Sequence, residues 1–483
     1  MTTEAQTRLI DATREHFGPK AVVTDAADIE PWSIDWRRRY RGMAPAILAP
    51  ADTLQLATIV AMANELGVAL VPQGGNTSMV GGAVPLPDGS ALILSLRRMN
   101  HIRSIDVGAR LAVVEAGVIL ADLQAAAEAQ GLRFPLTLGA RGTATIGGLC
   151  STNAGGTQVL RFGTMRGLVA GLEVVLVNGE IHDGLSPLKK DNRGYDLNQL
   201  LIGAEGTLGV ISAATLRLVP GIASRAVAWA GLSDPTAALA LLRRMEAASD
   251  AIESFEIVPD DSLQTVVRHI PGARSPLASR HPWHVLVEAV SGDPDGEHPS
   301  DLLERLLGAA LDDGAIGDAA IAASEAQADA FWRLRDSLSE AERTRGPAVQ
   351  HDISVPVASM PRFMIDAARA VEAQFPGTHA SAFGHLGDGN VHFHVRAPTG
   401  ADPIRWYAED GPVITRFVND LVVSSGGSIS AEHGIGQMKL DELERLSSPA
   451  RLEAMRAIKQ AMDPRQILNP GRLVRLAPFR PAP

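Results

Sequence analysis

Three glycine-rich segments lie within a stretch of about 140 residues in the first half of the chain. They cover residues 72–82, 139–156 and 203–209, and the first follows the apolar run Val-Ala-Leu-Val-Pro at 68–72. Glycine lets successive backbone amides converge, and such a nest binds anionic groups such as phosphate. None of the three matches GxGxxG or GxxxxGK[S/T], so a Rossmann fingerprint and a P-loop are excluded. One such segment alone is as often a set of turns, but three together predict a large phosphate-bearing cofactor.

A second pattern lies in the C-terminal half, where His385-Leu-Gly-Asp-Gly-Asn-Val-His392 is followed by Glu432-His433-Gly. Two neutral histidines and a glutamate are a common ligand set for Zn²⁺ or a similar divalent ion with an open coordination position. The glycine turn between His385 and His392 lets both reach one point. An isolated histidine is more often a surface or core residue. Four candidates in two glycine-flanked segments favour a metal or catalytic site.

The composition excludes several classes of protein. A chain of 483 residues with a net charge of -11 and 4% aromatic residues predicts two or three domains and argues against a nucleic-acid partner. The single cysteine, Cys150, rules out an internal disulfide and an Fe–S cluster. No run of eighteen apolar residues occurs, so no transmembrane segment is expected. The acidic residues near the N-terminus argue against a signal or transit peptide. We expect a cytoplasmic protein, with a peripheral position at the inner membrane as the alternative.

The spacing of apolar residues predicts a mixed α+β protein. Helices are expected at 1–18, 53–66, 120–130, 235–248, 301–311 and 325–345. Strands are expected at 46–50, 68–72, 91–96, 111–115, 168–177, 209–220, 283–290, 380–383 and 391–395. Asn178-Gly179 predicts a hairpin turn. After Pro220 the pattern of expected helices and strands changes, which predicts a domain boundary there.

The order of the motifs resembles one family over nearly the whole chain, from about residue 40 to 475. The motifs are PQGGNTSMVGG, TIGGLCSTNAGG, GAEGTLGVI, GHLGDGNVH, AEHGIG and DPRQILNPGRL. They resemble the FAD-linked D-2-hydroxyacid dehydrogenases, which include D-2-hydroxyglutarate dehydrogenases, D-lactate dehydrogenases and the glycolate oxidase D subunit. The resemblance implies a two-lobed flavoprotein of the vanillyl-alcohol-oxidase type. Its expected parts are an N-terminal helix and lead-in (1–45), an FAD-binding domain of PCMH type (46–220), an antiparallel-sheet substrate and metal domain (221–428) and a C-terminal segment that returns to the flavin lobe (429–483).

The resemblance also assigns the cofactor residues. FAD is expected to contact residues of the three glycine segments, one strand residue and one C-terminal asparagine. These are Pro72, Gly74, Gly75, Asn76, Thr77, Gly81, Gly82, Thr145, Gly148, Ser151, Asn153, Gly206, Ile211 and Asn469. Relatives that attach flavin covalently use a loop histidine where this sequence has Asn76, so the FAD is expected to be non-covalent. Cys150 is expected to be a small buried filler.

For the chemistry, the resemblance makes His385, His392 and Glu432 the metal ligands and His433 the catalytic base. A 2-hydroxy acid chelates a divalent ion through its carboxylate and hydroxyl oxygens, which lowers the pKa of the hydroxyl. His433 then accepts the hydroxyl proton, and hydride passes from C2 to flavin N5 to give the 2-oxo acid.

The substrate residues are expected to be Arg335, Ser339, Gln350 and His394. A guanidinium binds a carboxylate in a bidentate manner, although without the family match Arg335 would be read as a solvated helix charge. The sequence departs from the family at Gln350, where relatives carry a lysine that holds a substrate carboxylate, and at His394, where they often carry asparagine. His394 shares a face with His392 if the segment is a strand. D-lactate-like monocarboxylates and D-2-hydroxyglutarate therefore remain equally open as substrates.

Two other functions use the same fold. One is a flavin-dependent non-redox transferase of the alkyl-dihydroxyacetonephosphate synthase type, and the other is a flavin subunit of an electron-transfer complex. A dehydrogenase of this family implies a separate electron acceptor, such as electron-transfer flavoprotein, a cytochrome or a quinone, and we expect a homodimer.

Overall fold

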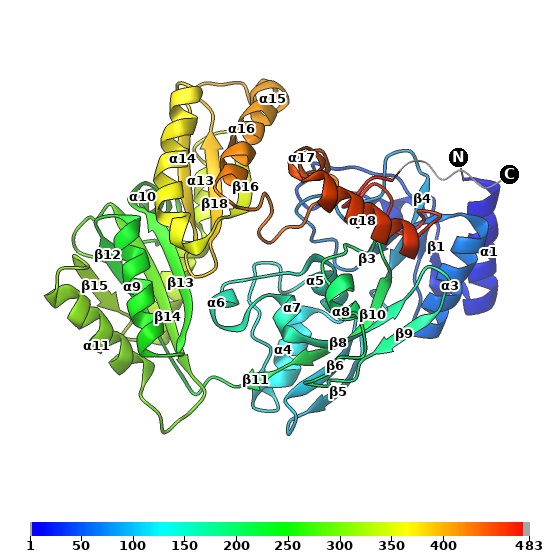
Figure 1. Ribbon diagram of the computed structural model, residues 1–483, viewed down its shortest axis with the longest axis horizontal. Coiled ribbons are helices and arrows are strands. Elements are labelled where there is room, and N and C mark those ends of the chain that lie inside the picture. Colours follow the sequence, from blue (N-terminus) through cyan, green and yellow to red (C-terminus); the bar gives the residue numbers. More distant parts are fainter. Residues whose placement is uncertain (1, 477–483) are drawn as a thin grey trace. The chain divides into compact units, whose positions relative to one another are not determined.

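The computed structural model describes residues 2–476 and divides into two compact units (Figure 1). Unit 1 contains the chain up to Gly156, then Gly163–Pro220, then the chain from Glu432 onward. Unit 2 contains Thr157–Phe162 and Gly221–Ala431. The polypeptide therefore contributes the short segment Thr157–Phe162 to unit 2, enters that unit again after Pro220 and returns to unit 1 at Glu432.

The first sheet of unit 1 has the order β1-β2-β4-β3. Its strands are β1 (Val22–Val23), β2 (Ile47–Leu48), β4 (Ala91–Ser95) and β3 (Ala69–Gln73), and both pairs that involve β4 are parallel. Helices α1 (Glu4–Phe17) and α3 (Thr53–Leu66) share a buried apolar cluster with this sheet. Helix α3 begins after Asp52, whose side chain accepts from the backbone N–H of Gln55, and ends at Gly67 in the left-handed conformation.

The second sheet of unit 1 is antiparallel throughout, in the order β5-β6-β10-β8-β9. Its strands are β5 (Ile102–Asp106), β6 (Leu111–Glu115), β10 (Val210–Arg217), β8 (Val169–Val175) and β9 (Ile181–Gly184). The predicted hairpin turn at Asn178-Gly179 is confirmed, because it joins β8 to β9. Strand β5 was not predicted, because its residues are exposed or half-buried and show no apolar alternation.

Unit 2 is built on a seven-stranded antiparallel sheet in the order β15-β12-β14-β13-β17-β18-β16. The strands are β15 (Asp318–Ile321), β12 (Ser224–Leu232), β14 (Trp283–Ser291), β13 (Ile252–Pro259), β17 (His379–His385), β18 (Asn390–Arg396) and β16 (Ala348–Ser354). The expected α+β class with an antiparallel substrate-domain sheet is confirmed.

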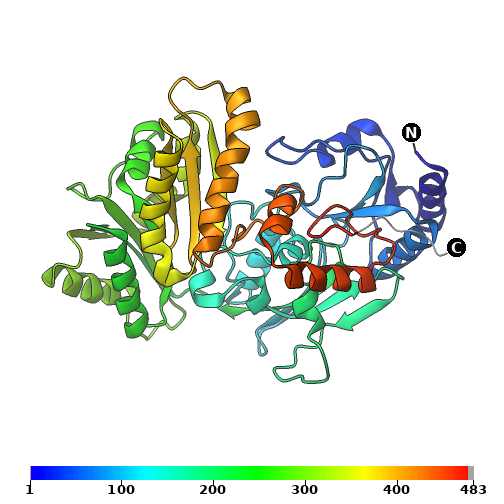
Figure 2. The same cartoon turned by 45° about the horizontal axis from the view of Figure 1, so that its top comes forward.

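Strand alternation sorts the side chains of this sheet between two cores. Val391, Phe393 and Val395 of β18 belong to the larger core, which is covered by α9 (Pro235–Ala248), α11 (Pro299–Asp312), α14 (Met360–Gln374) and α16 (Gly411–Ser424). Figure 2 shows α14 and α16, in yellow and orange, lying side by side along the sheet. The opposite face is covered by α10 (Asp260–His269), α12 (Glu325–Asp336) and α13 (Leu338–Arg343). The single helix expected at 325–345 is therefore two helices, separated at Ser337.

The remaining α-helices and strands are short or lie near the C-terminal end of the chain. They are α2 (Ala26–Ile29), α4 (Leu120–Glu128), β7 (Leu132–Arg133), α5 (Ile146–Thr152), α6 (Val159–Phe162), α7 (Met165–Leu168), α8 (Leu197–Leu201), β11 (Val219–Pro220), α15 (Pro403–Arg405), α17 (Leu440–Leu446) and α18 (Pro449–Met462). After α18 the polypeptide runs beside β3, where Leu70 donates its N–H to Ile467 and accepts from Asn469. None of the helices in residues 2–476 combines the length and the apolar character needed to cross a bilayer.

Candidate active site

The first and second glycine segments pack directly on each other in unit 1. A Cβ atom on Gly74 would lie 2.0 Å from Thr145 Oγ1, and one on Gly75 would lie 1.8 Å from the carbonyl oxygen of Thr143. A Cβ atom on Gly148 would lie 3.4 Å from the same hydroxyl oxygen. Side chains at Gly74 and Gly75 are thus excluded by the approach of the two segments, and the predicted cofactor residues of both segments are brought together.

Three predicted cofactor residues carry a buried oxygen that has no hydrogen-bond partner among residues 2–476. These oxygens are Thr145 Oγ1, Asn76 Oδ1 and Asn469 Oδ1. The two amides are oriented from the other side: Asn76 donates to the carbonyl of Ile34, and Asn469 donates to those of Gly82 and Glu205. Buried polar atoms are nearly always paired in folded proteins. Unpaired acceptors beside glycines that leave no room for side chains fit a polar ligand such as FAD.

The other predicted cofactor residues also lie in unit 1. Gly206 has a φ of +69°, and its hypothetical Cβ would lie 3.2 Å from Pro72. Asn153 ends α5 in the left-handed conformation and accepts from the backbone N–H of Arg166, so this amide oxygen is already engaged. Gly81 packs against Tyr40, and Ile211 is buried in β10. The backbone carbonyl of Ser151 accepts from the backbone N–H of Glu205, and Gly82 lies beside the carboxylate of the same residue. Thr77 is half-buried in the first segment.

Glu205 was not singled out from the sequence, yet its carboxylate joins the third glycine segment to the residues after His433. Its two oxygens accept the backbone N–H groups of Ile435 at 2.7 Å and Gly436 at 2.8 Å. Burial raises the pKa of this carboxyl above its usual range. The signal available in the sequence was an acidic residue within a glycine segment, Gly-Ala-Glu-Gly. Gln437 extends the same junction by donating to the carbonyls of Gly81 and Val84.

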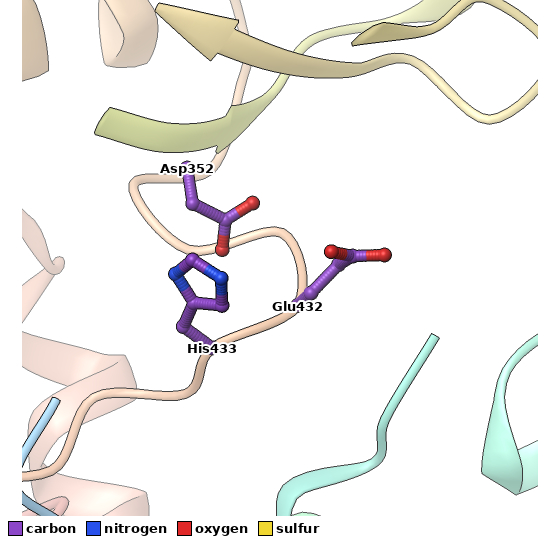
Figure 3. A group of neighbouring side chains, drawn as sticks. All are labelled: Asp352, Glu432 and His433. Atoms are coloured by element: carbon purple, nitrogen blue, oxygen red, sulfur yellow. The ribbon is translucent and has the colours of Figure 1, made fainter. Parts of the chain in front are cut away.

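Figure 3 shows the one group of three potential metal-ligating side chains found among the described residues, Asp352, Glu432 and His433. One donor atom from each lies within 4.8 Å of the others. Asp352 belongs to β16, and the segment just before Glu432 pairs with that strand through Ser428 and Ser354. Asp352 was missed as a candidate donor, because only the strand register brings it directly opposite His392.

Three of the predicted histidines, His385, His392 and His394, lie on one polar face of the unit 2 sheet. The cross-strand pairs are Gln350 with His394 and Asp352 with His392, while the rings of His385 and His392 have centroids 5.3 Å apart. His392 and His394 thus share a face, as expected for a strand. Burial, followed by the nearby charges of His385 and Arg335, holds the pKa of His392 well below its usual range. A neutral imidazole is the form that binds a metal ion.

Arg335 and His385 meet on Glu256, a second carboxylate that no sequence pattern singled out. Arg335 Nε donates to Glu256 at 2.7 Å, and His385 Nδ1 lies 2.6 Å from the other carboxylate oxygen. Burial alone would raise the pKa of Glu256, but the charges of Arg335 and His385 outweigh it and the pKa is lowered. No local motif marks Glu256, since His385 is 129 residues away in the sequence.

Comparison with known proteins places these features in a family. Residues 44–184 match the FAD binding domain model, and residues 223–473 match the model of the FAD linked oxidases, C-terminal domain. D-2-hydroxyglutarate dehydrogenase of Xanthomonas citri pv. viticola is 36% identical over 453 residues, 93% of each chain. The mitochondrial D-2-hydroxyglutarate dehydrogenase of Arabidopsis thaliana is 35% identical over 95% of this chain and 80% of its own length.

The protein belongs to the FAD-linked D-2-hydroxyacid dehydrogenase family. It is an FAD-dependent oxidoreductase, and the FAD expected from the glycine segments is the family cofactor. The crystal structure of p-cresol methylhydroxylase with substrate bound has the same fold, with a TM-score of 0.75 at 17% identity over 98% of this chain and 97% of that one. The expected vanillyl-alcohol-oxidase architecture with a PCMH-type FAD domain is confirmed.

Within this family assignment, the structure presents the expected site residues in two groups. His385, His392, His394, Gln350 and Arg335 gather on the polar face of the unit 2 sheet. Glu432 and His433 stand with Asp352. Ser339 is exposed on α13, one helix beyond Arg335, because the break at Ser337 separates the two residues that the sequence placed on one continuous helix.

Proposed function

We propose that this protein oxidises a D-2-hydroxy acid to the corresponding 2-oxo acid, using FAD and a divalent cation, and passes the electrons to a separate acceptor. The observation that carries the proposal is the polar face of the unit 2 sheet, where two histidines, a buried arginine–glutamate pair and Asp352 lie together. The names of the 35–36% identical relatives support a 2-hydroxy acid as the substrate.

His385, His392 and Glu432 are the proposed ligands of the divalent cation, and Asp352 adds a carboxylate next to them. Imidazole and carboxylate donors suit Zn²⁺ and similar ions. The lowered pKa of His392 supports this role, because a cationic imidazole cannot act as a ligand. A cation held here would polarise the substrate hydroxyl and lower its pKa.

His433 is the proposed base that accepts the hydroxyl proton. An imidazole suits proton transfer near neutral pH. The segment that follows it is held through Ile435 and Gly436 on the buried carboxylate of Glu205, which also lies beside Gly82 of the first glycine segment. This anchoring fixes the base relative to the cofactor segments, and such positioning is a large part of catalysis. Bound FAD supplies the acceptor for the electron pair that leaves the substrate.

Arg335 is the proposed partner of the substrate carboxylate next to the reacting carbon. Glu256 orients its guanidinium through Nε and lies almost entirely out of contact with solvent. A guanidinium held in one orientation recognises a planar carboxylate better than a mobile one. His394 and Gln350 are the proposed neighbours further along the same sheet face, and Ser339 is the proposed hydroxyl contact.

Anaerobic mixing of the holoenzyme with D- and L-2-hydroxy acids tests the proposal, with the FAD absorbance as the readout. We expect bleaching with one or more of D-2-hydroxyglutarate, D-2-hydroxybutyrate, D-lactate and D-mandelate, and none with the L-isomers. Treatment with a chelator should slow the bleaching about 100-fold or more, and Zn²⁺ or Mn²⁺ should restore it. If none of the acids bleaches the FAD, the protein is not a 2-hydroxyacid dehydrogenase. Bleaching that survives the chelator would remove the metal from the proposal.

A further inference from the structure

The polar face that carries His392 and His394 continues to a third residue of β18. Alternation along the strand places His392, His394 and Arg396 on one side, while Val391, Phe393 and Val395 enter the core on the other. The Cα partners of Arg396 are Ala348 in β16 and His379 in β17. Its side chain is 13% exposed, so a guanidinium is largely buried at the far end of the face from His385.

The charge of Arg396 is only loosely compensated. The nearest carboxylate is that of Glu342 in α13, with Oε2 3.6 Å from Arg396 Nη1, which is too long for a hydrogen bond. Asp261, which accepts from Arg345, is a second carboxylate that acts on the charge of Arg396. Both Nη1 and Glu342 Oε1 are buried and have no hydrogen-bond partner among residues 2–476. Burial, together with the nearby Arg345, lowers the pKa of Arg396, while burial raises the pKa of Glu342. A buried cation in these surroundings is costly unless an anion completes its hydrogen bonds.

The position of Arg396 along the sheet gives the spacing of two cationic groups. Arg335 lies with His385 at one end of the face, and Arg396 lies at the other. Arg396 comes four positions after His392 along the strand, a span of roughly 13 Å between their Cα atoms, and the long arginine side chain can reach over part of it. Gln350, which pairs with His394 between these ends, is neutral. The face therefore offers one cationic group to each end of a dicarboxylic acid that lies along it.

We propose that Arg396 binds the second carboxylate of a small D-2-hydroxy dicarboxylic acid, the class to which D-2-hydroxyglutarate belongs. This inference rests on the proposed function, since Arg335 and the histidines must hold the reacting end. Arg396 supplies the positive charge that relatives carry as a lysine at the position of Gln350. Glu342 is the internal counter-ion that the substrate carboxylate displaces. A dicarboxylate therefore remains the preferred substrate although Gln350 is neutral, because Arg396 supplies the positive charge from another position on the same sheet.

The experiment compares kcat/KM for D-2-hydroxyglutarate and for the monocarboxylate D-2-hydroxybutyrate. We expect the wild-type protein to prefer the dicarboxylate. Arg396→Gln should lower kcat/KM for D-2-hydroxyglutarate about 10- to 100-fold, mostly through KM, because a hydrogen bond to a charged group is lost. The value for D-2-hydroxybutyrate should change less than about three-fold, which is the measurement that separates recognition from a structural role. Arg343→Gln, at an exposed position on α13, is the matched control for loss of a positive charge and should alter neither substrate.

Two further variants keep the inference testable if Arg396→Gln folds poorly. Glu342→Gln removes the competing anion while leaving Arg396 in place, so it should lower KM for the dicarboxylate only. Gln350→Lys in the Arg396→Gln background should restore part of the dicarboxylate activity, because it returns a cation to the same face one pair away.

The outcomes separate this inference from the proposed function. Equal losses for both acids in Arg396→Gln would mean that Arg396 is a structural residue, and unchanged kinetics would mean that it does not meet the substrate. Either result overturns the inference while the dehydrogenase activity stands. Failure of the wild-type protein to oxidise both acids and every other 2-hydroxy acid would overturn the proposed function itself.

Discussion

Both units bury a glutamate at the functional region, and Glu205 and Glu256 are held there in different ways. Glu205 in unit 1 accepts two backbone N–H groups, and its pKa is raised by burial. Glu256 in unit 2 contacts Arg335 and His385, and their charges lower its pKa although it is also buried. Backbone N–H groups hydrogen-bond the first carboxylate, with the charges of Arg472 and Lys439 nearby, and charged side chains contact the second directly.

This difference extends to the regions around the two residues. The cofactor region of unit 1 is shaped by close backbone approach, glycines and amide side chains. The face of the unit 2 sheet is shaped by ionisable side chains that shift one another's pKa values. A site of the first kind selects a ligand by shape, and a site of the second kind can bind ions and transfer protons.

The largest expected effect tests whether the base belongs to the segment anchored by Glu205. His433→Gln should lower kcat about 10²- to 10⁴-fold, because proton transfer from the hydroxyl loses its acceptor. The FAD content and the thermal midpoint should stay near the wild-type values, since the anchor at Ile435 and Gly436 is intact. His16→Gln, at an exposed position on α1, serves as the control and should be fully active. A variant at His433 with more than a tenth of wild-type kcat would remove it as the base.

A smaller effect tests whether close backbone approach shapes the cofactor region. Gly75→Ala places a methyl group on the carbonyl of Thr143, so the two glycine segments must separate. We expect a loss of about 1–3 kcal/mol in the free energy of unfolding and a reduced FAD content per protein molecule. In the neighbouring segment, a Cβ on Gly142 would meet nothing within 4 Å, and Gly142→Ala should retain FAD. Equal FAD content in the two variants would contradict this account.

The smallest effect tests the opposite pKa shifts of the two glutamates directly. The raised pKa of Glu205 contributes stability that is present below the usual value of 4.5 and lost as pH rises through the folded-state pKa. The lowered pKa of Glu256 contributes stability that is present above 4.5 and lost as pH falls through the folded-state pKa.

On acidification, Glu205→Gln should therefore lose stability more steeply than the wild type, and Glu256→Gln less steeply. The sign of each difference follows from the direction of the pKa shift of the carboxyl that is removed. Urea unfolding of chelator-treated protein at a fixed excess of FAD, over a series of pH values, measures both slopes. Slopes that change in the same direction would show that the two carboxylates are not held differently.

Elements with strong local signals were predicted closely. Helices α3 and α9 begin and end at the predicted residues, because aspartate caps mark their starts and the apolar spacing runs their full length. Strand β5 was missed because neither of its faces is fully buried, and the break at Ser337 was missed because the helical spacing continues across it. For the site, glycines and histidines were recognisable by type and spacing. Glu205, Glu256 and Asp352 were not, because each acts through a partner that is distant in the sequence.

The sequence by itself determined the family, the cofactor and the residue types available for chemistry, because these depend on short motifs whose glycines and histidines have few alternative uses. Only the tertiary structure decided which carboxylates meet which cations. A one-residue change of strand register would send Asp352 or Arg396 to the opposite face of the sheet. Register is settled by the packing of the whole sheet between its two cores, and no short segment of sequence carries that information.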